Sequence, residues 1–315
     1  MAAEPVTSVR PVRATGRSRR VRPGKGSLAG IPFIYLLALL VFPIILLGAY
    51  SVFLLTNLNG VIATFSWEDW LAFIPNKWWP LWKTDSVFWN TFVRSTGVTI
   101  LVSVLTTIAA YPVAYFLAFV AHRRRYVLLL ILLAPFFTSF LLRVLAWQVI
   151  LADNGVINSA LWQLGLRPHG DGIPWLINTW FSVGLVLAYS WIPFVALPMF
   201  VVLENMDRRL LEAAQDLGAS RISTFLRVTL PLSLPGLIAG FVFVLIPTTG
   251  EFVTPQLVGG ADTYMFGQAI QDLFVGTAID WNYGAVLAVW LMIVVIILIG
   301  LTARFLVMDV REARG

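Results

Sequence analysis

The chain has 315 residues, of which 59% are hydrophobic and only 12% charged, and its mean hydropathy is +0.84. This composition is far more apolar than that of soluble globular domains, so an ordinary soluble enzyme or binding domain is excluded. The formal net charge is +6, and because the chain contains no cysteine it can form no disulfide and perform no thiol chemistry.

Residues 1–28 form a basic segment that is rich in proline, glycine and serine, and we predict a disordered cytoplasmic tail there. Gly24-Lys25-Gly26-Ser27 superficially resembles a phosphate-binding loop. It lacks the first glycine of that motif, however, and Gly26 stands where serine or threonine would bind magnesium. We therefore expect no bound ATP and no other cofactor in this chain, and no nucleic acid as a partner of the tail.

Residues 29–315 are predicted to form an all-α integral membrane domain. A membrane-spanning helix needs about 20 mostly apolar residues, and six stretches qualify. They are Ile31–Leu55, Thr91–Val120, Tyr126–Leu151, Trp180–Leu203, Pro235–Leu257 and Tyr283–Val307.

The basic residues orient these six predicted helices. Arginines and lysines concentrate in the tail, after the second span, after the fourth span and at the C-terminus, whereas the alternate loops hold few. Positively charged loops remain on the cytoplasmic side of a membrane. Both termini are therefore predicted to be cytoplasmic, in a multi-pass protein of a bacterial cytoplasmic membrane.

Two segments between the spans and one at the start of the fifth span have informative sequence patterns. Phe65–Trp89 is rich in tryptophan and indicates an aromatic segment at the outer membrane interface, or a ledge on which a binding protein docks. Asp262–Gly276 is predicted to be a short outer helix, because its apolar residues recur on one helical face. Gly236 and Gly240, four residues apart, permit close helix packing, which we expect within the subunit rather than at a dimer seam.

The longest cytoplasmic loop, about residues 204–234, has the pattern of a helical hairpin. Arg208–Leu217 is rich in helix formers, and Gly218 can adopt the left-handed conformation that ends a helix. Ser220 suits the N-cap of a second short helix, which Pro231 and Pro235 are expected to close. Small residues at such a bend allow it to enter a tight groove on a partner. The alternative is an ordinary amphipathic hairpin at the membrane surface.

Two ionisable residues, Arg143 and Glu251, are predicted to lie within the membrane. At a rise of 1.5 Å per residue, both lie roughly 25 Å above the cytoplasmic ends of their spans. Buried charges in a membrane usually face a partner, a cavity or a pathway. Pro247, Gly250 and Pro255 predict a broken helix around Glu251. Two roles for Glu251 follow, a place beside a translocation path or a purely structural pair with Arg143, and the sequence favours neither.

The hairpin resembles the EAA loop through which the membrane subunits of ABC importers dock into their ATPase. The residues that carry the resemblance run from Leu211-Glu212-Ala213-Ala214 through Asp216, Gly218, Ala219, Ser220 and Arg221 to Leu230-Pro231. Pro135-Phe136-Phe137-Thr138-Ser139 and Gly250-Glu251-Phe252-Val253-Thr254-Pro255 are similar to segments of spermidine/putrescine-type permeases, as is Asp280-Trp281-Asn282-Tyr283-Gly284-Ala285. The likeness covers about residues 30–308.

The resemblance implies a type I importer permease fold and a non-catalytic transport subunit. Its expected partners are a cytoplasmic ABC ATPase dimer, a second homologous permease, an extracytoplasmic solute-binding protein and the lipid bilayer. It implies that the EAA-loop residues Glu212, Ala213, Ala214, Asp216, Gly218, Ala219, Ser220 and Arg221 couple to the ATPase.

The expected solute is a polyamine or a related small cation. Acidic outer loops favour cations, and aromatic faces attract ammonium groups. The candidate pathway residues are Glu251, Phe252, Arg143, Trp147, Tyr189 and Trp191. A secondary transporter or channel is the competing class, although the chain has no convincing internal repeat and only one clear membrane-depth acid. A scaffold that moves no solute is a third possibility.

Overall fold

The computed structural model describes residues 25–56, 62–65, 68–73, 86–166, 168, 172–276 and 279–312. The chain divides into two units, residues 1–46 and 47–315, and each is described by itself. Most of the tail predicted to be disordered lies outside the described residues, as do Trp67, Trp78, Trp79 and Trp82 of the aromatic segment. Helix α1 (Lys25–Val52) begins slightly earlier than predicted, so residues 25–28 are helical rather than part of a disordered tail.

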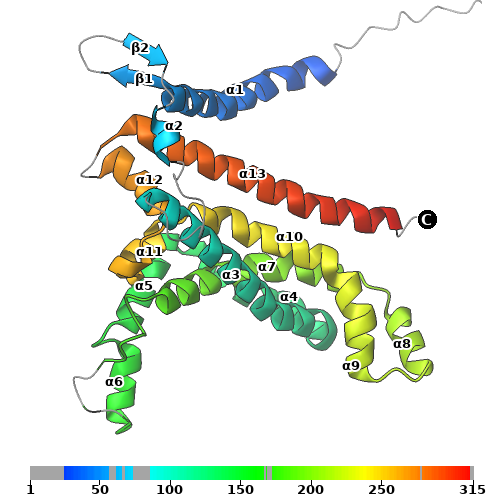
Figure 1. Ribbon diagram of the computed structural model, residues 1–315. Coiled ribbons are helices and arrows are strands. Elements are labelled where there is room, and N and C mark those ends of the chain that lie inside the picture. The colour runs from blue at the N-terminus through cyan, green and yellow to red at the C-terminus, as the bar shows by residue number, and fades with distance from the viewer. Residues whose placement is uncertain are drawn as a thin grey trace, which may run out of the picture. The chain divides into compact units, whose positions relative to one another are not determined.

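The second unit is predominantly helical (Figure 1). Its first elements in chain order are β1 (Phe53–Thr56), β2 (Ile62–Phe65), α2 (Glu68–Phe73), α3 (Val87–Tyr115), α4 (Arg125–Leu133), α5 (Phe140–Leu151) and α6 (Val156–Gln163). They are followed by α7 (Trp180–Glu204), α8 (Arg208–Asp216), α9 (Arg221–Thr224), α10 (Leu230–Thr249), α11 (Val253–Val258), α12 (Phe266–Val275) and α13 (Trp281–Glu312). Short π-helical turns cover Phe116–Val120 and Phe225–Thr229, and 3₁₀ turns cover His122–Arg124, Ala134–Phe137 and Ala261–Thr263.

Six helices in the described part of the chain are long and apolar enough to cross a membrane. They are Pro32–Val52, Val87–Val120, Phe140–Gln163, Trp180–Glu204, Arg221–Thr249 and Trp281–Thr302. The predicted all-α class and the number of spans are thus confirmed. The antiparallel pairing of β1 with β2, in which Phe53 lies opposite Phe65, was not predicted.

The predicted third span is wrong as a continuous helix. Pro135 cannot donate a backbone hydrogen bond, and its ring crowds the preceding turn, so α4 ends in a 3₁₀ turn. Thr138 is extended, Ser139 is also non-helical, and the Thr138 hydroxyl donates to the Pro135 carbonyl at 2.6 Å. The chain resumes as α5 at Phe140. Because the helix is broken, the depth of Arg143 calculated from an unbroken rise does not apply.

The core of the second unit is built around α3, α7 and α10, which pack against one another. Gly240 brings α10 against α7 so closely that a Cβ on it would lie 2.7 Å from Val195 Cγ1. A Cβ on Gly236 would lie 3.1 Å from Met199 Cα. The expectation that these two glycines serve packing within the subunit is confirmed, because both face α7 of the same chain.

Buried polar groups also join α3 to its neighbours. The Tyr111 hydroxyl and Ser233 Oγ lie 2.9 Å apart, and the Phe266 N–H donates to Ser95 Oγ at 2.8 Å. Such bonds between helices stabilise membrane bundles, because lipid offers no competing partner. They connect α3 to α10 near one end and to α12 near the other.

The helix predicted within residues 262–276 is confirmed as α12, with Phe266 and Leu273 buried against α3 and α13. Two tryptophans of the predicted aromatic segment, Trp70 and Trp89, pack into the same cluster around Phe73. The Trp70 indole also donates to the Ser51 carbonyl at 2.8 Å. These two residues therefore contribute to the core of the unit.

Candidate functional site: a coupling hairpin and a charged cavity

Helices α8 and α9 form the predicted hairpin at one end of α10, away from α11 and α12 (Figure 1). Asp207 caps the start of α8 by accepting the Arg209 N–H at 3.0 Å. The end of α8 is a Schellman motif, in which the Ala219 N–H donates to the Ala214 carbonyl and the Gly218 N–H to the Gln215 carbonyl. Gly218 has φ of +84°, the left-handed conformation predicted for it.

Helix α9 begins as predicted, since Ser220 Oγ accepts the Ser223 N–H at 3.2 Å. The expectation that Pro231 and Pro235 close this helix is wrong. The chain stays helical from α9 through the π turn at Phe225–Thr229 into α10. Pro231 lies directly after this π turn, where the regular ladder of helical hydrogen bonds is already interrupted, so its missing N–H does not end the helix. The hairpin therefore continues directly into a membrane-spanning helix.

The tip of the hairpin presents most of the predicted coupling residues on its surface. Glu212, Ala213, Asp216, Gly218, Ser220 and Arg221 are exposed, whereas Ala214 and Ala219 are half-buried inside the bend. Leu217 and Ile222 are 89% and 73% exposed, and they make the tip apolar as well as small. The sequence reasoning omitted these two residues, although apolar residues flanking a polar bend were a visible signal.

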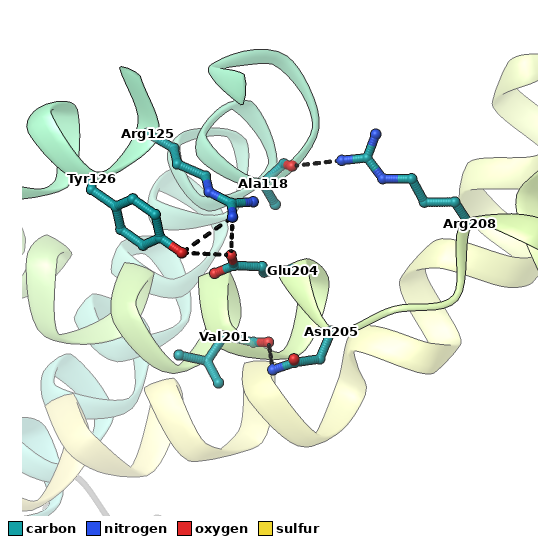
Figure 2. Close-up of polar contacts among 7 residues, drawn as sticks. All are labelled: Ala118, Arg125, Tyr126, Val201, Glu204, Asn205 and Arg208. Carbon is teal, nitrogen blue, oxygen red and sulfur yellow. Dashed lines mark hydrogen bonds and ion pairs between the residues drawn. The ribbon is translucent and has the colours of Figure 1, made fainter. Parts of the chain in front are cut away.

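Two sets of contacts hold the hairpin to the rest of the second unit. The Phe225 ring packs edge-on against the rings of Tyr111 and Tyr115 in the C-terminal part of α3. The Arg208 guanidinium donates to the Ala118 carbonyl at 3.4 Å (Figure 2). These contacts would therefore transmit a displacement of the hairpin to α3 as well as to α10.

An ion pair fixes the loop that precedes the hairpin. Arg125, at the start of α4, lies 2.8 Å from Glu204 Oε1, at the end of α7 (Figure 2). The Tyr126 hydroxyl donates to the same carboxylate oxygen at 3.1 Å. This three-residue network ties α4 to α7 and was not predicted from the sequence.

The second element of the site is a cavity of about 290 Å³ in the second unit. It is lined by Phe136, Phe140, Arg143, Ser190, Trp191, Phe194 and Glu251. The structure thus brings together three of the six predicted pathway residues, namely Arg143, Trp191 and Glu251. Trp147 and Tyr189 pack against each other, with ring centroids 5.2 Å apart, and Phe252 is 38% exposed; none of these three lines the cavity.

Arg143 and Glu251 share this cavity without forming an ion pair; within the described residues, the ion pair found is that of Arg125 and Glu204. The guanidinium carbon of Arg143 lies 4.4 Å from the Phe136 ring centroid and 5.7 Å from that of Phe140. Its Nε and Nη1 atoms are buried and have no hydrogen-bond partner. The structural pair considered from the sequence is therefore absent in this conformation.

Glu251 is held by the backbone that follows it. As predicted, the helix breaks here, with α10 ending at Thr249 and α11 beginning at Val253. Glu251 is 8% exposed, and its Oε1 accepts the N–H groups of Val253 and Thr254 at 2.9 and 3.0 Å. A carboxylate at the N-terminus of a helix is stabilised by the free N–H groups there. Glu251 thus orients α11.

This geometry predicts different effects for two substitutions of Glu251. Glu251→Ala removes the acceptor of two N–H groups and should destabilise the complex by about 1–3 kcal/mol. Glu251→Gln retains a carbonyl oxygen as acceptor and should cost less than half as much. Thermal unfolding of the purified complex measures both. Equal destabilisation by the two variants would contradict this account of the cap.

Comparison with known proteins is consistent with this architecture. Spermidine/putrescine transport system permease protein PotB of Escherichia coli K12 is 34% identical over 210 residues, which are 67% of this chain and 75% of PotB. The inner membrane ABC transporter permease protein YdcU of the same organism is 32% identical over 256 residues, covering 76% of this chain and 81% of YdcU.

Among solved structures, a bacterial ABC transporter that imports the acidic polysaccharide alginate contains a chain with the same fold. The TM-score is 0.62 at 18% identity, covering 91% of this chain and 94% of that chain. Residues 103–309, which include the hairpin and the cavity, match the family described as the binding-protein-dependent transport system inner membrane component. The chain belongs to this family and is a multi-pass permease subunit of the inner membrane.

Proposed function

We propose that this chain forms half of the translocation pathway of an ATP-driven importer for a small amine-bearing solute, with polyamines as the first candidates. It performs no covalent chemistry, because ATP hydrolysis belongs to a separate ATPase dimer that the α8–α9 hairpin contacts. A second, homologous permease supplies the other half of the pathway. An extracytoplasmic binding protein delivers the solute to the outer surface.

The observation that carries the proposal is the continuity of the hairpin with α10. The exposed tip around Gly218 is small and apolar enough to fit a groove, and α9 runs without interruption into the helix that ends beside Glu251. Movement of the ATPase would shift the tip, and α10 would carry that shift to the helix break at the cavity. Phe225 would transmit it to α3 through Tyr111 and Tyr115.

Two observations support a cationic solute. PotB, which is 34% identical, is a permease of a spermidine/putrescine transport system. In addition, acidic side chains gather at the end of the second unit that carries α2. The pKa of Asp69 is raised, mainly by burial and further by the nearby carboxylates of Asp280 and Glu68. Such mutual repulsion reports a negative local potential, which attracts amines.

The proposal predicts ATP-dependent uptake. The complex, purified through this chain and reconstituted with its binding protein in vesicles, should import labelled putrescine or spermidine only when ATP is supplied to the ATPase side. Vesicles that hold a proton or sodium gradient without ATP are the control. Import driven by a gradient alone would contradict the proposal and favour a secondary transporter. ATP-dependent import of a solute without an amine would refute only the choice of solute.

A further inference from the structure

The cavity has the chemical composition of a site for an organic cation. Four aromatic residues, Phe136, Phe140, Trp191 and Phe194, line it together with Glu251. Aromatic faces attract ammonium and guanidinium groups, most strongly where water is excluded. Ser190 adds an oxygen that can accept a hydrogen bond; the residue is 1% exposed, and its Oγ has no partner.

The cation that now occupies this cavity is a side chain of the protein itself. The Arg143 guanidinium lies over the Phe136 ring at 4.4 Å, the shortest arginine–aromatic distance among the described residues. The Arg143 guanidinium makes few polar contacts, however. Its buried Nε and Nη1 have no acceptor, although a buried donor without a partner is unfavourable. Glu251 does not anchor it, because the ion pairs of the described chain include none between them.

The anionic part of the cavity, in contrast, is fixed independently of Arg143. Glu251 Oε1 accepts two backbone N–H groups of α11, so the carboxylate would keep its position if the guanidinium left. The close packing of Gly267 against the Glu251 backbone, where a Cβ would lie 2.6 Å from the Glu251 carbonyl oxygen, also limits its movement. The cavity therefore combines a fixed carboxylate and fixed aromatic faces with one displaceable cation on a flexible side chain.

We propose that this cavity binds a primary ammonium group of the solute, and that the Arg143 guanidinium is its internal occupant, which leaves the Phe136 face when the solute enters. The inference rests on the proposed function and adds the position of the cation site and the role of Arg143. Two cations in one small cavity repel each other. Solute and Arg143 therefore compete for the site. Weak retention of the amine follows, which suits a pathway that must release its cargo.

Binding of labelled putrescine to the purified complex, without the binding protein, tests the proposal. Arg143→Gln removes the competing charge and should lower the putrescine dissociation constant by about tenfold, the effect of one cation–π interaction of about 1.4 kcal/mol. Arg143→Lys retains a cation and should bind putrescine like the unaltered complex. Glu251→Gln should weaken binding. Arg94→Gln is the matched control: Arg94 also lies over an aromatic ring, that of Trp180, but outside the cavity, and its loss should change nothing.

Three outcomes of these binding measurements would overturn the proposal. If Arg143→Gln weakens putrescine binding, Arg143 holds the solute or an acceptor on the partner permease, and the proposal is overturned. Unchanged affinity in Arg143→Gln also overturns it, as does the absence of putrescine binding in a complex that imports putrescine. A complex that hydrolyses ATP but imports no amine at all would instead refute the choice of solute on which the inference depends. Copurification of the ATPase with each variant confirms that the complex is assembled.

Discussion

Substituting Gly218 by valine should abolish coupling between this chain and its ATPase. Gly218 has φ of +84°, a conformation that costs other L-residues about 1–2 kcal/mol and β-branched residues more. Valine would therefore disrupt the Schellman motif and change the angle between α8 and α9. A Cβ there would meet no atom within 4 Å, so the effect would come from the backbone alone. We expect solute uptake to fall by at least about tenfold.

Two controls make this prediction specific to the hairpin. Gly165, at the end of α6, has φ of +68°, an open environment and the same Schellman hydrogen bonds, but it lies outside the hairpin. Gly165→Val should therefore cause similar local strain and leave ATPase attachment intact. Gly218→Asn should retain most of the uptake, because asparagine tolerates the left-handed conformation. Copurification of the ATPase and vesicle uptake are the two measurements. Normal attachment and uptake in Gly218→Val would refute the coupling role of the hairpin.

The second large effect is expected at Gly240, where α10 touches α7. A methyl group on Gly240 would lie 2.7 Å from Val195 Cγ1, closer than packed atoms can approach. Overpacking of this kind costs about 1–3 kcal/mol. Because α10 connects the hairpin to the cavity, Gly240→Ala should lower both the thermal stability of the complex and the uptake.

The same contact supplies a rescue experiment. Val195→Ala removes the clashing atom, and the next atom that the new methyl group would meet is the Val195 carbonyl oxygen at 3.2 Å. Gly240→Ala combined with Val195→Ala should therefore recover most of the lost stability, giving a favourable interaction energy in a double-mutant cycle. Gly97→Ala in α3, where a Cβ meets no atom within 4 Å, should be neutral or slightly stabilising. If the double variant loses as much stability as the two single variants lose together, the clash with Val195 is not the cause of the destabilisation by Gly240→Ala.

The sequence was informative wherever local chemistry dictates local structure. Hydropathy predicted the helical class and the number of spans, because a membrane-spanning segment must satisfy its own backbone hydrogen bonds in lipid. Gly218 and Ser220 determined the bend of the hairpin, since only certain residues adopt the left-handed conformation or cap a helix. Pro247, Gly250 and Pro255 likewise indicated the break beside Glu251. These features need no knowledge of distant parts of the chain.

Other features depended on contacts between distant segments. Local rules predicted that Pro231 and Pro235 end a helix, but the π turn before them lets the chain continue into α10. Equal depth permitted a pair between Arg143 and Glu251 but did not favour it over a place beside the pathway. Only the tertiary structure placed the guanidinium on Phe136 and the carboxylate on the N-terminus of α11. The interaction partner of a buried side chain depends on how several helices pack together. The spacing of residues along one helix carries no information about that packing.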